Sequence, residues 1–225
     1  MEWRAGARWL AMAQDHHDSA QMSTRPLQNR VTPWGALEAV PDRGLMMGNR
    51  GGRIHRGDRT LRTRRWASKQ WIICVLEFRG RQRQVMGPGY TELFFLDDAV
   101  AAAAGHRPCF ECRRADALAF AEGWRAAEGA AVRQRAPEMD ARLHAQRRGA
   151  RPWGLAHDLP VGAMFTQGGA AFLRVPGGAR VWGWQGYGPV SPLPAAQVET
   201  LTPEGAVQAL RGGWRPILHP SALIG

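Results

Sequence analysis

ELFFLDDAVAAAAGHRPCFECRRAD, residues 92–116, is the stretch of sequence that decides the fold. It opens with a short aliphatic and aromatic run, which favours a buried strand. Asp97 follows and is placed to cap a helix over DAVAAAA, and Gly105 is placed to end that helix. Because the helix is short and rich in alanine, one of its faces has to be packed. The stretch therefore predicts a strand, a packed helix and then a turn that holds two cysteines.

A second buried strand is expected upstream. Residues 71–78, WIICVLEF, combine β-branched, aromatic and aliphatic side chains between polar flanks. The turn MGPG at residues 86–89 would allow this strand, the RQRQV piece and the strand at residues 92–96 to form an antiparallel sheet. Residues 27–52 are dense in turn-forming residues, which predicts an arm with one or two short extended pieces.

Downstream of the cysteines, helices are predicted at residues 115–128 and 137–148. From residue 159 the pattern changes to short strands separated by glycine turns, which is typical of a compact β unit. A last helix is predicted with Thr202 as its N-cap and Gly212 at its end.

The composition is that of a folded protein with one large or two small domains. The chain has 225 residues, of which 44% are hydrophobic and 22% charged, so it is not intrinsically disordered. No apolar stretch reaches the ~18 to 20 residues that cross a bilayer, which predicts a cytoplasmic protein without a membrane partner. Three cysteines are too few for a disulfide framework and favour reduced thiols or metal ligands.

The positive charge is concentrated in one segment. The net charge is +11, and residues 50–83 contain eleven basic and two acidic residues, which gives that segment a net charge of +9. Such a concentration is typical of an anion-binding surface. It predicts nucleic acid, either DNA or RNA, as the partner.

Within this segment arginine recurs every three residues. In an extended loop that period would place guanidinium groups along a phosphate backbone, and Trp66 and Trp71 could stack on unpaired bases. The alternative is a solvated loop that owes its arginines to codon bias and turns its tryptophans into the core. The predicted nucleic-acid-binding residues are Arg50, Arg53, Arg56, Arg59, Arg62, Arg65 and Trp66.

The cysteines form a candidate metal site. Cys109 and Cys112 are two residues apart on a turn, a spacing that lets two thiolates bind one zinc ion. Cys74 in the predicted strand and His106 could complete a closed structural site. Alternatively Cys74 is a buried hydrophobic residue, His106 caps the helix end, and the C-x2-C pair is a redox dithiol.

Residues 94–116 resemble the second half of the zinc-binding N-terminal domain of the Ada alkylation-response protein. The likeness rests on the two phenylalanines, on AGHRPC and on the C-x2-C-R ending. It implies a similar local fold and a metal. The family has a further C-x3-C pair before the strand, which this chain lacks, so methyl-acceptor chemistry is not implied. NRVTPWG, LMMGNRGGRIH and EMDARLH are similar to an uncharacterised bacterial protein family of about this length, which implies no activity.

An enzyme is the alternative to a binding protein. Glu77, Glu92 and Asp97 cluster around the two predicted strands and could hold Mg²⁺ for chemistry on nucleic acid or on a phosphorylated ligand. Helix capping explains Asp97 equally well, and a strand edge explains Glu77.

These observations predict an α+β protein. Residues 1–26 are expected to be a poorly ordered extension, and residues 27–149 an arm with a small sheet-and-helix module that ends in the Ada-like C-x2-C. Residues 150–225 are expected to form a β-rich module with a C-terminal helix. The predicted function is nucleic-acid binding, with a possible structural zinc. The sequence predicts no oligomeric state.

Overall fold

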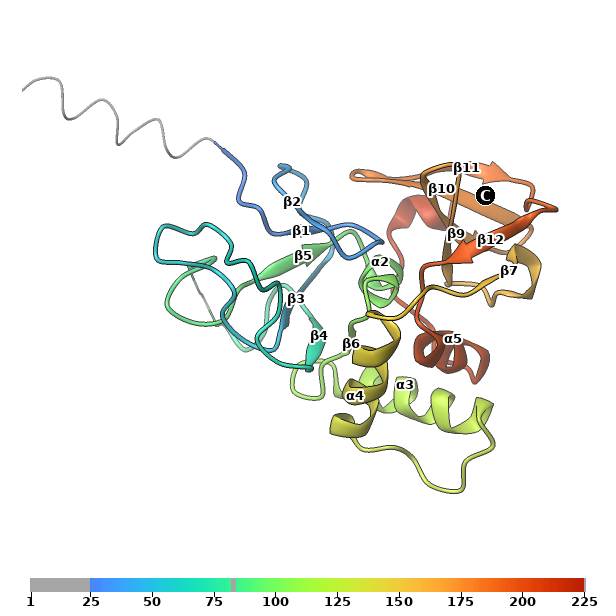
Figure 1. Cartoon of the computed structure of the whole chain (residues 1–225), viewed down its shortest axis with the longest axis horizontal. Helices are drawn as coiled ribbons and strands as arrows, with labels where there is room; N and C mark the ends of the chain where they lie inside the picture. The colour runs from blue at the N-terminus through green and yellow to red at the C-terminus, as the bar shows by residue number, and fades with distance from the viewer. Residues whose placement is uncertain (1–24, 82–83, 225) are drawn as a thin grey trace, which may run out of the picture.

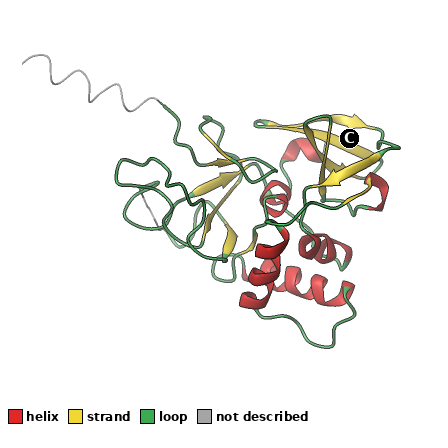
Figure 2. Cartoon of the chain, in the orientation of Figure 1, coloured by secondary structure: helices red, strands yellow, loops and turns green. Residues whose placement is uncertain are grey.

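The described part of the protein contains two six-stranded sheets and the helices between and beside them (Figure 1). This computed structural model describes residues 25–81 and 84–224. Figure 2 shows that the longer helices lie together, next to both sheets. The predicted α+β class, with a β-rich second part and a C-terminal helix, is confirmed. The predicted extension, residues 1–26, lies outside the described residues except for its last two.

The first sheet has the strand order β2-β1-β5-β3-β4-β6. The pairs β1–β5 and β4–β6 are parallel, and the other neighbours are antiparallel. Its strands are β1 (Arg30–Val31), β2 (Leu37–Glu38), β3 (Met46–Arg50), β4 (Trp71–Cys74), β5 (Leu93–Phe95) and β6 (Arg107–Pro108).

The strands predicted near residues 71–78 and 92–96 belong to one sheet, but they are not neighbours in it. β3 lies between β4 and β5 and pairs with both. A glycine in β3 allows this close packing, because a Cβ atom at Gly48 would lie 2.1 Å from the carbonyl oxygen of Ile72. One of the short extended pieces expected in the arm is thus an inner strand of the sheet.

The second sheet is antiparallel throughout, in the order β11-β10-β9-β8-β12-β7. Along β9 buried and partly buried side chains alternate, as expected for a strand with one face on the core. Its strands are β7 (Trp153–Leu155), β8 (Met164–Gln167), β9 (Ala170–Val175), β10 (Gly178–Gly183), β11 (Gly186–Ser191) and β12 (Gln197–Thr200).

The helices begin and end close to the predicted positions. They are α2 (Asp98–Ala103), α3 (Arg114–Ala127), α4 (Ala136–Gln146) and α5 (Glu204–Arg211), with 3-10 turns η1 (Ala156–Asp158) and η2 (Pro220–Ala222). Among the described residues, no helix is long and apolar enough to cross a membrane.

The capping predictions differ in outcome between the two helices concerned. The Asp97 carboxylate accepts the Val100 N–H at 3.0 Å and caps α2, and Gly105 has the predicted positive φ of +83° after its end. Thr202 is not the N-cap of α5: its hydroxyl accepts the Met164 N–H at 2.8 Å and ties the helix entry to β8.

The first turn of α2 joins distant parts of the chain. Besides capping the helix, Asp97 accepts the hydroxyl of Tyr187 from β11 and the N–H of His219 at 3.0 Å. Asp98 forms a buried ion pair with Arg113 and accepts the Ile217 N–H at 2.9 Å. Both aspartates have no solvent exposure. This turn therefore connects both sheets, α3 and the C-terminal segment.

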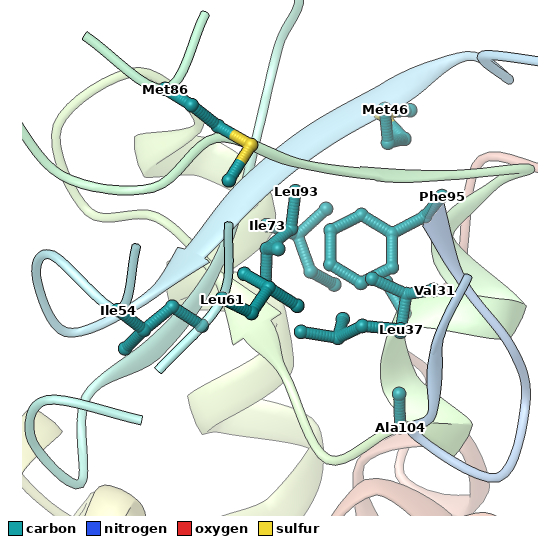
Figure 3. Packing of buried hydrophobic residues seen from close by; sticks show 11 residues of the cluster. Val31, Leu37, Met46, Ile54, Leu61, Ile73, Met86, Leu93, Phe95 and Ala104 are labelled. Carbon is teal, nitrogen blue, oxygen red and sulfur yellow. The ribbon is translucent and has the colours of Figure 1, made fainter. Parts of the chain in front are cut away.

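The hydrophobic core continues from one sheet to the other. Figure 3 shows the first cluster, in which the ring of Phe95 lies among Leu93, Leu37 and Val31. On the other side of α2, Leu96 and Val100 belong to a cluster with residues of β8 and β9. The two sheets are thus held by shared packing around α2.

Removal of the Arg113 side chain should destabilise the fold strongly. Arg113→Met leaves Asp98 as a buried carboxylate without its partner, which costs about 3 to 5 kcal/mol. Chemical denaturation measures this change. The neighbouring Arg114 is exposed, and Arg114→Met should change the unfolding free energy by no more than about 0.5 kcal/mol. Equal effects of the two substitutions would contradict this role of the pair.

Asp97 should make stability depend on pH. Burial raises the pKa of its carboxyl from the ordinary 3.8 to about 6. The folded state binds this proton more tightly than the unfolded chain. The stabilisation that the protonated Asp97 carboxyl contributes is therefore complete below about pH 4 and is lost as the pH rises to about 6. The difference in unfolding free energy between the wild type and Asp97→Asn, measured across pH 4 to 7, should shrink as the pH rises. A constant difference would rule out titration of Asp97.

Candidate functional site

The three cysteines of the chain lie together. The sulfur atoms of Cys74, Cys109 and Cys112 are all within 4.8 Å of one another, so the group could hold a metal ion. Cys74 and Cys109 are buried, and Cys112 is partly exposed. Tetrahedral zinc with bonds of about 2.3 Å separates its sulfur ligands by slightly less than 4 Å. The donor set therefore fits a thiophilic metal without a large movement of the chain.

The register of the sheet brings these cysteines together. β4 and β6 are parallel neighbours in which Ile73 lies opposite Pro108. The residue that follows each of these two in the chain is a cysteine, and the Cys109 N–H donates to the Ile73 carbonyl at 2.9 Å. The chain then reverses, with the Arg113 N–H donating to the Cys109 carbonyl at 3.0 Å, which returns Cys112 to the same place.

The cluster stabilises a thiolate at Cys109. Hydrogen bonds from the thiols of Cys112 and Cys74, and from the Glu111 N–H, lower the pKa of Cys109 well below the ordinary value of a thiol. The pKa of Cys74 is raised, because its thiol donates to Cys109 and to Cys112. A bound cation would replace the protons that hold the cluster together.

His106 does not belong to this group. Its ring is buried between aromatic neighbours, with centroids 4.9 Å from Trp71 and 4.7 Å from Phe95. Nδ1 lies 3.2 Å from the Ala101 carbonyl oxygen, and Nε2 accepts the Arg50 Nε–H. Both ring nitrogens are therefore engaged away from the sulfur atoms, and the described residues offer three ligands instead of the four expected.

The three candidate carboxylates are not brought together. Glu77 is exposed, Glu92 is buried and accepts the Met86 N–H at 2.7 Å, and Asp97 is engaged at the start of α2. Of these, Glu92 lines a second cavity, of about 160 Å³, together with the cysteines. Among residues 25–81 and 84–224, no three carboxylates lie close enough together to hold a metal ion.

The arginine-rich segment is not an extended loop. It folds back on itself, with a bridge between His55 and Leu61 and a turn at Arg59, whose φ is +63°. Arg56 donates to the Leu61 carbonyl at 2.7 Å and Arg62 to the His55 carbonyl at 3.2 Å, so two of the predicted phosphate ligands also hold the loop.

The predicted arginines thus differ in their environment. Arg50 is buried, Arg65 is half-buried, and Arg53, Arg56, Arg59 and Arg62 are exposed. Within the described part of the chain, no hydrogen bond or ion pair engages the guanidinium groups of Arg53 and Arg59. The exposed arginines lie on a loop that folds back on itself, so they do not form the regular row that the spacing predicts.

A cavity of about 410 Å³ lies where this segment meets α4 and the entry to α5. We call it the arginine–tryptophan cavity. Two of its lining residues are positioned by the first sheet, because Arg50 at the end of β3 pairs with Trp71 at the start of β4. Its principal lining residues are Trp34, Arg50, Arg65, Trp66, Trp71, His144, Arg147 and Arg148.

Guanidinium groups and indole rings alternate in this cavity. The guanidinium carbons of Arg50 and Arg147 lie 4.1 and 3.9 Å from the Trp71 ring centroid. Trp66 is 6.5 Å from Trp71 and 5.8 Å from the His144 ring, and Arg148 lies 5.6 Å from the Trp66 centroid. Cation–π contacts of this kind keep arginine next to tryptophan when water is excluded.

The cavity carries positive charge that no carboxylate neutralises. Burial, and then the nearby Arg147 and Arg65, lower the pKa of Arg50 to about 9. Burial, and then Arg147 and Arg148, also lower the pKa of His144, which favours its neutral form. Within the described residues, none of Arg50, Arg65, Arg147 and Arg148 forms a salt bridge. The arrangement is suited to an anion.

Two buried donors of the cavity's arginines have no hydrogen-bond partner in the described part of the chain. They are Nη1 of Arg65 and Nε of Arg147. The other donors of Arg147 are used, at 3.1 Å to the Gly105 carbonyl and 2.9 Å to the Lys69 carbonyl. A buried donor without an acceptor is costly, so these two groups favour an acceptor from a ligand or from water.

Sequence reasoning found part of this cavity. Arg50, Arg65, Trp66 and Trp71 were expected to contact nucleic acid, whereas Trp34, Arg147 and Arg148 were missed. Basic residues are common in the last turn of a helix, where they oppose the helix dipole, so RRG after α4 gave no functional signal. Only the tertiary packing brings them to the arginine-rich segment.

No protein-family model, curated protein or solved structure matches this chain.

The cysteine cluster should bind one thiophilic divalent cation per chain. With Zn²⁺ as the probe, the purified protein should take up one equivalent and melt at a higher temperature, because the ion binds the folded state. Cys112→Ser should abolish both effects. Cys74→Ala distinguishes the two possible roles of Cys74. The variant should lose the metal if Cys74 is a ligand and should retain it if Cys74 is only a buried hydrophobic residue. Full zinc content in Cys112→Ser would contradict the assignment.

Proposed function

We propose that this protein binds nucleic acid through the folded arginine-rich loop and the adjoining arginine–tryptophan cavity, and that a zinc ion at the three cysteines stabilises the sheet that carries both. The observation that carries the proposal is the group of uncompensated guanidinium groups around indole rings in a cavity of about 410 Å³. Phosphates supply the missing negative charge, and bases supply planar faces for the tryptophans.

The position of the loop supports the proposal. Residues 51–70 connect β3 to β4, so the exposed arginines of the loop are continuous in sequence with the cavity residues Arg50, Arg65 and Trp66. Arg53 and Arg59 are exposed and have no polar partner in the described part of the chain. Their donors are free to bind phosphate without disturbing the fold.

The cysteines support a structural role for the zinc. They lie at the ends of β4 and β6, and β4 begins at Trp71 of the cavity. A metal that ties Cys74 to Cys109 and Cys112 would fix this edge of the sheet. The zinc acts on binding indirectly, because the sulfur ligands and the cavity lie at opposite ends of β4.

Neutralisation of the free loop arginines should weaken binding to every nucleic acid alike. In Arg53→Gln/Arg59→Gln, log K for duplex DNA should fall less steeply with log salt, by up to about two units of slope, since each lost phosphate contact accounts for about 0.9. Fluorescence anisotropy at several salt concentrations measures the slope.

The matched control removes two arginines elsewhere. Arg133→Gln/Arg215→Gln causes the same change in net charge at exposed positions outside the loop, so its slope should remain that of the wild type. Identical slopes for the two double variants would show that the loop makes no phosphate contacts. The absence of binding to duplex DNA, single-stranded DNA and RNA at low salt would refute the proposed function.

A further inference from the structure

We infer that the arginine–tryptophan cavity holds one unpaired nucleotide of the bound strand, with its base against Trp66 and its phosphate on Arg65 and Arg148. The inference rests on the proposed function and specifies the substrate class, single-stranded or unpaired nucleic acid. It is argued from three properties of the cavity: its unneutralised charge, its aromatic wall and its size.

The charge requires an anion. Arg50 is 2% exposed and its donors reach only neutral acceptors, the Gly35 carbonyl at 2.8 Å and His106 Nε2 at 3.4 Å. Asp140, which favours the charged form of Arg147, is itself paired with Arg107 at 2.8 Å. Glu204 at the cavity rim is exposed and lies 3.8 Å from Arg211. Each nearby carboxylate therefore either has another cationic partner or lies at the exposed rim.

The available donors fit a phosphate. Arg65 Nη1 is buried and has no partner among the described residues, and Arg148 is exposed at the end of α4, over the Trp66 ring. One guanidinium comes from the loop and the other from the turn after α4, so an anion between them would be held from two sides. Phosphate oxygens accept such charge-assisted hydrogen bonds well.

The aromatic wall fits a base. Trp71 already carries the guanidinium groups of Arg50 and Arg147 within about 4 Å, whereas those near Trp66 are at 5.4 and 5.6 Å. Trp66 is only half-buried, so its ring is the one available to a ligand. Stacking on indole accepts any base, because every base has a planar face.

The size excludes a duplex. About 410 Å³ falls in the range of cavities that hold one small ligand, roughly 300 to 1,000 Å³, so the cavity has room for a single nucleotide and not for a section of duplex. A stacked and paired base cannot enter unless it leaves the helix. An unpaired nucleotide enters directly, and its neighbouring phosphates can continue onto the exposed arginines of the loop.

The test compares strands that share phosphates and differ in bases. A short oligothymidine and an abasic strand of equal length are titrated with the full chain, alongside a blunt hairpin duplex. The wild type should bind oligothymidine about 5- to 150-fold more tightly than the abasic strand, as expected for one stacked base. Trp66→Leu should remove this preference and leave the affinity for the abasic strand and the duplex unchanged.

Two further variants complete the test. Arg65→Gln should weaken oligothymidine binding more than duplex binding, because the free donor of Arg65 lines the cavity, whereas the exposed arginines of the loop remain in this variant. Trp184→Leu, a half-buried tryptophan on the β10–β11 turn, is the matched control and should keep the preference for bases. Circular dichroism verifies that each variant is folded.

The outcomes separate this inference from the proposed function. Equal affinity for oligothymidine, the abasic strand and the duplex, unchanged in Trp66→Leu, overturns the nucleotide pocket and leaves nucleic-acid binding by the loop intact. No affinity for any of the three ligands overturns both. Binding of free nucleoside monophosphate but of no polymer would assign the cavity to a small phosphorylated ligand and also overturn both.

Discussion

The ion pair between Asp98 and Arg113 is the contact on which the arrangement of the two sheets depends. Both side chains are buried, and the Asp98 carboxylate also accepts a hydrogen bond from the backbone N–H of Ile217, 119 residues further along the chain. Asp97 beside it accepts the Tyr187 hydroxyl from the second sheet. A buried carboxylate is tolerated only where donors surround it, so this turn of helix fixes several segments at once.

A buried charge without an ionic partner lies at the end of β3, where Arg50 is the last residue of the strand. There the buried charge is positive, and within the described residues no carboxylate forms a salt bridge with it. A fold that satisfies Asp98 with a full ion pair leaves Arg50, Arg65 and Arg147 without one. Such local imbalance lowers stability in the unbound protein and is typical of binding sites, where the ligand supplies the missing charge.

The cysteine cluster and the cavity are linked through β4. The strand begins with Trp71, whose ring carries two guanidinium groups, and it ends with Cys74, which lies against Cys109. Four residues thus connect a candidate metal centre to a candidate nucleotide pocket. Stabilising one end of so short a strand also limits movement at the other, because β3 pairs with β4 along its whole length and β6 pairs with its two middle residues.

Local signals in the sequence were sufficient for much of the fold and for part of the site. Asp97 was predicted as a helix cap because a carboxylate at that position accepts a backbone N–H of the first turn, which depends only on neighbouring residues. Cys109 and Cys112 were recognisable as a candidate metal-binding pair because their spacing fixes their proximity. The α+β class likewise follows from the order of apolar runs and turns.

Contacts between distant segments could be decided only by the tertiary structure. β3 was expected to be part of an arm, since nothing within MMGNR indicates that two strands flank it. Cys74 reaches the cysteine pair through the register of β4 and β6, whereas His106, closer in sequence, points elsewhere. The three-residue spacing of the arginines is visible in the sequence. The arginines do not form a regular row in the structure, because backbone hydrogen bonds fold the loop. By itself the sequence determined the chemistry available, and long-range packing decided which groups meet, since burial and register depend on residues far apart in the chain.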